Sequence, residues 1–550
     1  MFPSENFSAL DCYFVILLMT TLLVVNLFIC KHLWGMARVV VQKVDASRAL
    51  LIALLAGYVV LLVFIGGYST QFAPGSADEF AYLYQAETFL AGRVSNPVIA
   101  DPDTFRMWPW CMYENAGRIS SHYPPGWPAT LASFMFFGVP GELVNLLLSL
   151  LVIGLFYSFA SRFYDRKIVL LSCFVLASSP FFIFNALSTF SHVSVLVFFL
   201  CFLLFLHSEN IGKRWYYAVF AGVFLGACFV TRYFTAVCLG ALPLAWIFLA
   251  RKEVPLTEGK EGFRARYKIL FQIALGFLVV FSLNAFYNSS VTGNPFLEPL
   301  SHKFGGGEPF SVLGSELSYL WGRVLEPREW FQPIHREFFI WLTPLALFLY
   351  VTRLFQVRVL ESVQYIEFIF VVVLLGHLFV FPWYPGEQFG PRYFFEVYPF
   401  FLLSVCCLTL PDKIDVSRWV WLSRASLLTI VQTHLILNVF FAMDIRREII
   451  SKQRLDRAIS ALQIEEAVIV TGEGVEPYSA ETAIRAGLLR NDIDFKNDPL
   501  KVLMPSFDCT LVQESFPGKK IYRIERDILG LTPELALVCH DDERERESNL

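Results

Sequence analysis

Charged residues are scarce in this chain: Asp, Glu, Lys and Arg make up 17% of its 550 residues, whereas 56% of the residues are hydrophobic. The chain holds 56 phenylalanines, and its mean hydropathy of +0.54 is too high for a soluble protein of this length. The formal net charge is -4 and the basic residues are scattered, which excludes the polycationic face of a nucleic-acid-binding protein. The composition therefore predicts a protein of the lipid bilayer.

The sequence also lacks the spacings that bind transition metals. It has eleven cysteines, but no CxxC pair and no Cys/His ligand pattern, and most of the cysteines lie within apolar runs. Cys111, Cys509 and Cys539 lie outside those runs and could form a disulfide among themselves, although nothing in the sequence favours one pairing. The first apolar stretch, 12–30, follows acidic rather than basic residues, so we interpret it as a membrane span and not as a cleaved signal peptide.

About twelve stretches are long and apolar enough to cross a bilayer, for which a helix needs roughly 20 apolar residues. Connections rich in Lys and Arg alternate with connections that hold few, and the positive-inside rule assigns the basic ones to the cytoplasm. Both termini and the two long loops, 68–128 and 288–336, are then predicted outside. The stretches lie near 12–30, 49–67, 142–160, 168–186, 191–207, 216–231, 234–250, 269–287, 337–352, 364–382, 395–410 and 419–441.

The composition changes after residue 445. Strand-like runs at Ala467–Thr471 and Lys520–Ile524 flank a helix-like run at Ala480–Arg490. The predicted fold class is therefore an α-helical polytopic membrane protein with a small C-terminal α/β domain outside the membrane. The predicted parts are a transmembrane domain over 1–445, the α/β domain over 446–535 and a charged, disordered tail over 536–550.

Two adjacent carboxylates, Asp78 and Glu79, open the first outer loop. Transfer of a sugar from a phosphate carrier needs one carboxylate to deprotonate the acceptor hydroxyl, because phosphate leaves with the help of a cation. Glycoside hydrolysis would need a pair of carboxyl groups astride the bond. The alternative is that Asp78 or Glu79 caps the following helix, since acidic first turns are common.

Two proline-rich segments hold polar residues where the chain enters the membrane. The first is His122-Tyr123-Pro124-Pro125-Gly126-Trp127-Pro128, which fixes a rigid entry and could direct His122 and Tyr123 toward a phosphate. The second runs from Tyr384 to Tyr393 and holds Arg392, a side chain suited to bidentate phosphate contact. The alternatives are a helix-start turn for the first segment and an interfacial, snorkelling cation for the second.

Three further polar sites are weaker candidates. His192 and Arg232 interrupt apolar sequence near the outer face and could line a cavity, or could be a packing residue and a turn residue. Asp101-Pro102-Asp103 has the DxD spacing of some metal sites, but a solvated turn explains it better.

The order of these features resembles the GT-C superfamily, in particular the bacterial protein O-mannosyltransferase and aminoarabinose transferase type (family 39-like). The resemblance implies that Asp78 is the catalytic base, with Glu79 beside it. It also implies that Tyr123 and Arg392, with the adjacent Tyr393, contact the polyprenyl-phosphate headgroup. The stretches that carry it are SADEFAYLYQAETFLAGR (76–93), HYPPGWPATL (122–131), SSPFFIFNALSTFSHVS (178–194), NAFYNSSVTGNPFLEP (284–299) and FGPRYFFEVYPF (389–400).

Two departures accompany the resemblance. Relatives commonly carry Lys immediately before YPPG, whereas His122 stands here, and a neutral pH leaves a histidine only partly charged. The span at 12–30 is an addition before the helix that normally precedes the acidic loop, and it leaves the predicted orientation unchanged.

The sequence thus predicts an inner-membrane hexosyl- or pentosyltransferase that takes a sugar from a polyprenyl-phosphate carrier on the periplasmic side, with inversion. Its partners would be the lipid-linked sugar, membrane lipids and a glycan, lipid or protein acceptor, with a divalent metal as an open option. One rival is a transporter or flippase of lipid-linked sugars, which usually shows internal repeats and mid-membrane charges. The other is a glycan polymerase or ligase that uses a diphosphate-linked donor.

Overall fold

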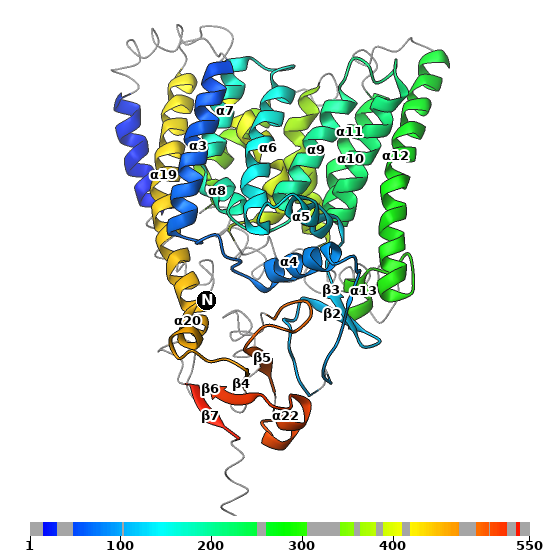
Figure 1. Cartoon of the computed structure of the whole chain (residues 1–550). Coiled ribbons are helices and arrows are strands. Elements are labelled where there is room, and N and C mark those ends of the chain that lie inside the picture. Colours follow the sequence, from blue (N-terminus) through cyan, green and yellow to red (C-terminus); the bar gives the residue numbers. More distant parts are fainter. Residues whose placement is uncertain are drawn as a thin grey trace, which may run out of the picture. The chain divides into compact units, whose positions relative to one another are not determined.

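The computed structural model describes residues 15–29, 48–101, 104–249, 260–304, 341–356, 363–380, 389–409, 418–471, 491–504, 506–524 and 535–539 (Figure 1). The chain divides into two compact units. Unit 1 comprises Met1–Phe72, Glu142–Phe286 and Phe310–Ile445. Unit 2 comprises Ala73–Gly141, Tyr287–Pro309 and Arg446–Leu550.

Unit 1 is helical in its described part. Large apolar side chains such as Phe64 (74% exposed), Phe271 (71%) and Leu283 (68%) lie on its helix surfaces, an arrangement suited to contact with lipid. Its elements are Val15–Ile29, α3 (Arg48–Tyr68), α6 (Val144–Ala160), α7 (Arg166–Ser178), α8 (Pro180–Ala186), α9 (His192–Leu206), α10 (Trp215–Thr231), α11 (Tyr233–Leu249), α16 (Pro344–Leu354), α17 (Ile369–Val380), α18 (Tyr398–Cys407), the 3-10 helices η3 (Val363–Phe368) and η4 (Arg392–Val397), and most of α12 (Lys260–Thr292) and α19 (Arg418–Lys452).

The helices occur where the sequence predicts membrane spans. In the described residues, each of the twelve apolar stretches overlaps a helix or a pair of helices. By length and composition, four of the described helices could cross a membrane, or five if one bent pair counts as a single span, and six further apolar helices have 10–17 residues. The polytopic helical class is confirmed, and the number of about twelve spans stays a prediction.

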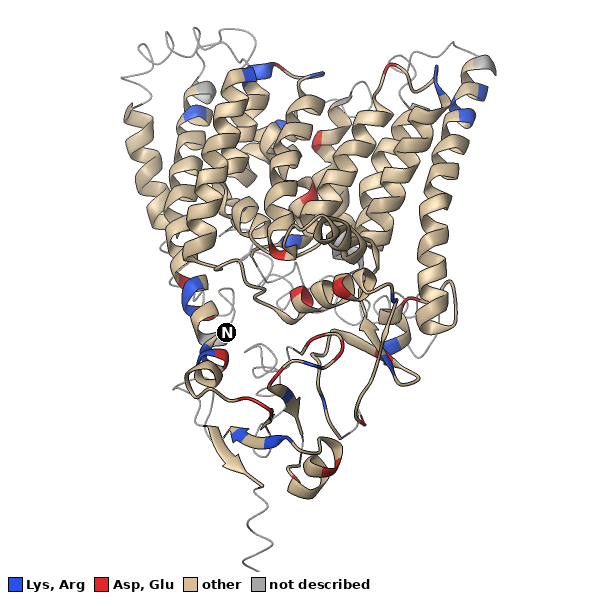
Figure 2. Cartoon of the chain, viewed as in Figure 1, with Lys and Arg blue, Asp and Glu red and all other residues tan. Residues whose placement is uncertain are grey.

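Basic residues mark one end of the unit 1 helices. Figure 2 shows Lys and Arg gathered where α7 and α12 begin, at the same end of the bundle. These residues belong to the connections that the positive-inside rule assigns to the cytoplasm. The arrangement agrees with the alternation seen in the sequence.

The predicted span at 168–186 is broken. Helices α7 and α8 meet at an angle of 65° around Ser179, whose backbone is extended (φ -74°, ψ 128°). The cause is Pro180, which has no amide hydrogen and disfavours helical backbone in the residue before it. Because of the break, α8 ends at a buried turn, and the backbone carbonyls of Ser188 and Phe190 in this turn accept the amide of Asn145 at 2.7 Å each.

Two glycines let α10 and α12 touch through their backbones. A Cβ atom on Gly222 would lie 1.9 Å from the carbonyl oxygen of Ile273, and one on Gly276 would lie 2.0 Å from that of Val219. Small residues at such a crossing allow close helix packing in membranes. This contact fixes α10, whose C-terminal end carries Arg232.

Unit 2 contains two small sheets and several helices. A three-stranded antiparallel sheet has the order β1-β3-β2, and a four-stranded sheet has the order β5-β4-β6-β7, in which β4 pairs in parallel with β5 and β6 while β7 is antiparallel. The elements are α4 (Ala77–Leu90), β1 (Asn96–Pro97), β2 (Met112–Asn115), β3 (Arg118–Ser121), α5 (Gly126–Phe136), α13 (Pro299–Phe304), α20 (Arg454–Ala461), β4 (Ala467–Thr471), β5 (Leu500–Leu503), α22 (Cys509–Ser515), β6 (Lys520–Ile524) and β7 (Leu535–Val538), with η1 (Gly141–Leu143) at its border with unit 1.

The C-terminal α/β part shares a hydrophobic core with the loop 68–128. Ala81 and Tyr84 of α4 pack in one buried cluster with residues of β4, β5 and α22, such as Val502 (0% exposed). Arg106 pairs with Leu503 at the edge of β5, and the amide of Asn491 donates to the carbonyls of Met107 and Lys501. The C-terminal part is therefore built into the same unit as the loop that carries Asp78.

The predicted strands Ala467–Thr471 and Lys520–Ile524 are present as β4 and β6, which confirms a small α/β part near the C-terminus. The predicted helix Ala480–Arg490 and residues 540–550 of the predicted disordered tail lie outside the described residues, whereas residues 536–538 of that predicted tail are ordered in β7.

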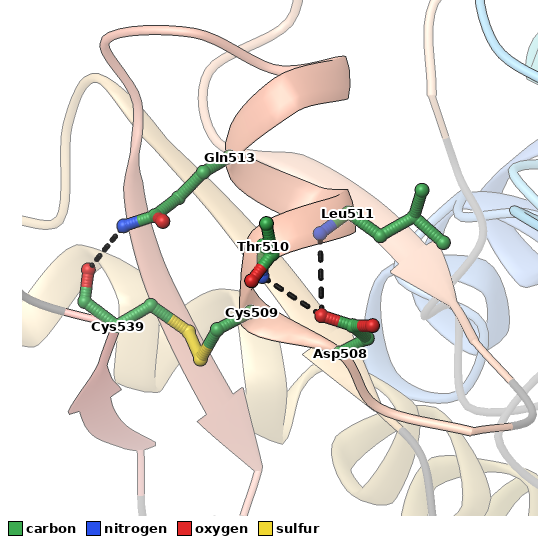
Figure 3. Close-up of a disulfide and its surroundings, with 6 residues drawn as sticks. All are labelled: Asp508, Cys509, Thr510, Leu511, Gln513 and Cys539. Atoms are coloured by element: carbon green, nitrogen blue, oxygen red, sulfur yellow. Dashed lines mark hydrogen bonds between the residues drawn. A yellow bond between two sulfur atoms is a disulfide. The ribbon is translucent and has the colours of Figure 1, made fainter.

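A disulfide closes the C-terminal sheet (Figure 3). It joins Cys509, at the start of α22, to Cys539 just after β7, with their Cα atoms 5.5 Å apart. The side-chain amide of Gln513 donates to the carbonyl of Cys539 at 2.9 Å, and Asp508 caps α22 by accepting the amides of Thr510 and Leu511. Of the three cysteines between which the sequence leaves the choice open, Cys111 is buried and unbridged.

Candidate functional site

Helix α4 begins with a reciprocal cap. Ser76 is its N-cap residue, and its hydroxyl accepts the amide of Glu79 at 3.2 Å. Glu79 Oε2 in turn accepts the Ser76 hydroxyl at 3.2 Å and the amide of Gly75 at 2.7 Å. This is a variant of the Ser-x-x-Glu capping box, in which the glutamate accepts the backbone amide of Gly75, the residue before the N-cap. Glu79, a predicted substrate-binding residue, is buried (2% exposed) and fills this capping role, for which Asp78 is not needed.

Asp78 faces Tyr123. The two side chains share a hydrogen bond, and burial together with the Asp78 charge raises the pKa of the Tyr123 phenol well above its usual value. The rings of Tyr82 and Tyr123 lie 4.6 Å apart, and the Cys111 thiol donates to the carbonyl of Ala77 at 2.8 Å. Tyr123 therefore stays protonated and donates its hydroxyl hydrogen to the Asp78 carboxylate, which orients that carboxylate.

His122 is buried beside this pair. It is 1% exposed, and its ring lies 4.3 Å from that of Tyr123 and 5.4 Å from that of Trp110. Burial, with a smaller contribution from the charge of Lys303, lowers the pKa of His122 to about 3. His122 is therefore neutral at physiological pH and cannot supply the positive charge expected of a phosphate contact; what it can offer is a neutral hydrogen bond.

The buried neutral state of His122 should make stability depend on pH. An unfolded chain protonates this histidine below pH 6.5, whereas the folded chain protonates it only near pH 3, so protons favour unfolding. The free energy of unfolding should fall as the pH drops below 6.5, by up to about 1.4 kcal/mol per pH unit. We expect the stability of His122→Gln to depend less on pH than that of the wild type. Thermal unfolding measured at several pH values between 5 and 7.5 tests this. Identical slopes in the two proteins would contradict the buried neutral state.

Lys303 supplies a positive charge next to His122. This residue of α13 donates from Nζ to the carbonyl of Met112 at 2.8 Å and to that of Trp110. Its charge acts on both His122 and Cys111, and partial burial lowers the pKa of its own ammonium group. Sequence reasoning missed Lys303 because a lone lysine in a long loop gives no signal.

A second polar group lies in unit 1, where His192, Arg232 and Glu396 meet. His192 Nδ1 lies 3.0 Å from Glu396 Oε1, and Arg232 Nη1 lies 3.4 Å from His192 Nε2. Arg232 Nε is also 3.8 Å from Glu396 Oε1. A guanidinium can only donate, so we assign the proton of His192 to Nδ1, which then donates to the carboxylate while Nε2 accepts from Arg232.

Arg392 and Tyr393 complete this group. The guanidinium carbon of Arg392 lies 4.3 Å from the centroid of the Phe190 ring and 5.8 Å from that of Tyr393. Arg232 lies 5.0 Å from the same Tyr393 centroid, so both cations contact one ring. We call His192, Arg232, Arg392, Tyr393 and Glu396 the cation group.

The structure gathers the predicted site residues within the units that contain them. Unit 2 brings together Asp78, Glu79, His122 and Tyr123. Unit 1 brings together His192, Arg232, Arg392 and Tyr393 with Glu396, which sequence reasoning missed. Glu396 could have been found from the sequence, because it is an acidic residue inside the apolar run FFEVYPF. Ionisable residues at such positions usually have a function.

The described residues hold no group of three or more His, Cys, Asp or Glu side chains that could bind a metal ion. Asp101 accepts the Thr104 hydroxyl at 2.5 Å, as a turn residue does, and Pro102 and Asp103 lie outside the described residues.

The fold and the two polar groups define a polytopic, helical membrane protein with a carboxylate–tyrosine pair in one unit and a cation group in the other. Residues 127–286, which include His192 and Arg232, match the family described as Dolichyl-phosphate-mannose-protein mannosyltransferase. The predicted resemblance to GT-C glycosyltransferases is confirmed over this segment, which is less than a third of the chain. A search of curated proteins finds no match.

Several solved structures show a distant similarity. ArnT from Cupriavidus metallidurans bound to undecaprenyl phosphate is 12% identical, with 79% of this chain and 84% of that chain covered and a TM-score of 0.45. The apo state of ArnT is 12% identical over 80% of this chain and 85% of that chain, with a TM-score of 0.47. The oligosaccharyltransferase AglB from Archaeoglobus fulgidus, in complex with an inhibitory peptide and a dolichol-phosphate, is 10% identical over 86% of this chain and 69% of that chain, with a TM-score of 0.42.

Proposed function

We propose that this protein is a membrane glycosyltransferase that moves one sugar from a polyprenyl-phosphate carrier to an acceptor hydroxyl on the extracytoplasmic face. The sugar would be a hexose or a pentose. The family match over residues 127–286 supports glycosyl transfer, and the apolar helices support a reaction at the surface of a bilayer.

In this reaction Asp78 acts as the general base. It takes the proton of the acceptor hydroxyl as that oxygen bonds to the anomeric carbon, and the bond from this carbon to the phosphate oxygen breaks. The bonding electrons leave with the phosphate, so the products are the glycosylated acceptor and free polyprenyl phosphate. A single displacement of this kind inverts the anomeric centre.

The phosphate that leaves needs positive charge rather than an acid. Arg232 and Arg392 can supply it, because a guanidinium binds phosphate oxygens through two parallel hydrogen bonds and keeps its charge at any physiological pH. His192 and Tyr393 would orient the two arginines by the contacts described above.

The capping box of α4 is the observation that carries the proposal. Because Ser76 and Glu79 make the side-chain cap of α4, Asp78 is not needed as its capping residue. Asp78 instead hydrogen-bonds to Tyr123, a partly buried tyrosine that orients its carboxylate. This is the arrangement expected of a positioned base.

Two observations support an extracytoplasmic location for unit 2. Disulfides persist in oxidising compartments and are rare in the cytosol, and unit 2 contains the Cys509–Cys539 bridge. The basic connections of unit 1 belong on the cytoplasmic side by the positive-inside rule. We therefore propose the periplasmic face of a cell inner membrane as the site of the reaction.

Purified protein in lipid nanodiscs, incubated with a panel of radiolabelled polyprenyl-phosphate sugars and candidate acceptors, tests the proposed reaction. We expect one labelled sugar to move to an acceptor and an equal amount of free polyprenyl phosphate to appear, and parallel samples with a chelator report on metal dependence. In vesicles, movement of the intact carrier across the bilayer without cleavage would contradict the proposal and favour a transporter.

A further inference from the structure

Glu396 is a buried carboxylate inside a group of cations. It lies in η4, which begins at Arg392, and its side chain is 1% exposed. Burying a carboxylate costs several kcal/mol unless it is paired and hydrogen-bonded. Oε1 of Glu396 has such partners in His192 and Arg232, and these residues belong to the group that would bind phosphate. Oε2 is buried and has no hydrogen-bond partner among the described residues.

The geometry gives Glu396 two effects on its neighbours. Its hydrogen bond with His192 Nδ1 fixes the tautomer of the ring, so that Nε2 accepts from Arg232 Nη1 and holds one edge of that guanidinium. Its negative charge, 3.8 Å from Arg232 Nε, also offsets one of the two arginine charges. With His192 neutral, the net charge of Arg232, Arg392 and Glu396 is close to one positive charge.

This net charge affects how differently the cation group binds the donor and the product. A polyprenyl-phosphate sugar is a phosphodiester with one negative charge, whereas free polyprenyl phosphate is a monoester with about 1.5 to 2 negative charges at pH 7. Two uncompensated arginines would bind the monoester far more tightly than the diester and would retain the product. A fixed negative charge beside Arg232 repels the monoester more than the diester, and so reduces the difference between the two affinities.

We infer that Glu396 is a positioning residue that holds His192 and Arg232 in place and, by its charge, weakens the preference of the cation group for the phosphomonoester product. The inference rests on the proposed function, in which this group binds the carrier phosphate. It predicts that removing the charge, while keeping the hydrogen bond, makes product release slower.

Glu396→Gln tests the charge effect, because the amide oxygen can still accept from His192 Nδ1 while the charge is lost. The full-length protein in nanodiscs is titrated at pH 7.5 with farnesyl phosphate, a monoester, and with its methyl ester, a diester. The measured quantity is the ratio of the two dissociation constants. We expect the variant to raise the preference for the monoester about tenfold, from the removal of one charge in a medium of intermediate dielectric constant.

Glu396→Asp is the second variant, since it keeps the charge and shortens the side chain. Its monoester preference should stay within about twofold of the wild type, while its turnover falls because His192 and Arg232 are no longer held. Glu367→Gln is the matched control: Glu367 is also a buried glutamate of unit 1, paired with Arg353 at 2.9 Å, and its loss should leave the ratio unchanged.

An unchanged ratio in Glu396→Gln, or equal changes in the Gln and Asp variants, would overturn the inference. The binding measurement does not depend on turnover, so the two proposals can fail separately. A wild-type protein that binds the two esters as described but transfers no sugar would overturn the proposed function alone. Normal transfer with an unchanged ratio would overturn the role of Glu396 alone.

Discussion

Asp78→Asn should lower the rate of sugar transfer by a factor of about 10² to 10⁴, the usual contribution of a general base. Asparagine has nearly the same shape, and its oxygen can still accept from the Tyr123 hydroxyl, so the local structure should persist. It cannot take a proton from the acceptor. Binding of the polyprenyl-phosphate carrier should therefore remain near the wild-type value while turnover is lost.

The matched control for this variant is Asp101→Asn. Asp101 is an acidic residue of the same loop, 68–128, that closes a turn with Thr104, and an asparagine can make the same hydrogen bond. Its transfer rate should stay within about twofold of the wild type, as for most surface substitutions. If the two variants behave alike, Asp78 is not the base.

Val502→Asp should abolish transfer to every acceptor. Val502 is fully buried in β5, in the core that also holds Ala81 and Tyr84 of the Asp78 helix α4. An unpaired charge in this core costs several kcal/mol, a large part of the stability of a typical domain. We expect less than 1% of wild-type transfer, together with a lower unfolding temperature of unit 2.

Lys496→Ala is the control for the core variant. Lys496 lies in the same C-terminal segment, and its exposed side chain forms a 3.8 Å ion pair with Asp494, so its loss should change stability by less than about 0.5 kcal/mol. The outcome separates two roles for the C-terminal part. Uniform loss of activity in Val502→Asp indicates a support for α4, whereas a changed choice of acceptor would indicate a substrate-selecting module.

The membrane helices could be predicted from the sequence because lipid imposes a simple rule on length and polarity. All twelve predicted stretches coincide with helices, and the strands at Ala467–Thr471 and Lys520–Ile524 have the predicted bounds. The break at Ser179 was not predicted, although Pro180 was its visible cause. A hydropathy window averages over such a residue.

The candidate site could be predicted only as a set of separate residues. The sequence alone leaves open whether Asp78 or Glu79 caps α4, and only the hydrogen bonds show that Glu79 does. The neutrality of His122 and the charge of Lys303 beside it depend on burial and on a contact between two loops, which no local pattern encodes. The same holds for the core that α4 shares with the C-terminal sheet.

Site-directed labelling of residue 78 tests the central claim most directly, because the account requires this carboxylate on the extracytoplasmic side of the membrane. Asp78→Cys is treated in intact spheroplasts with a membrane-impermeant maleimide and analysed by peptide mass spectrometry. Glu114→Cys, an exposed residue of unit 2, and Lys213→Cys, an exposed residue of a basic connection, serve as references for the two sides. The account predicts that residues 78 and 114 are labelled in intact cells and residue 213 only after lysis; labelling of residue 78 only after lysis would contradict it.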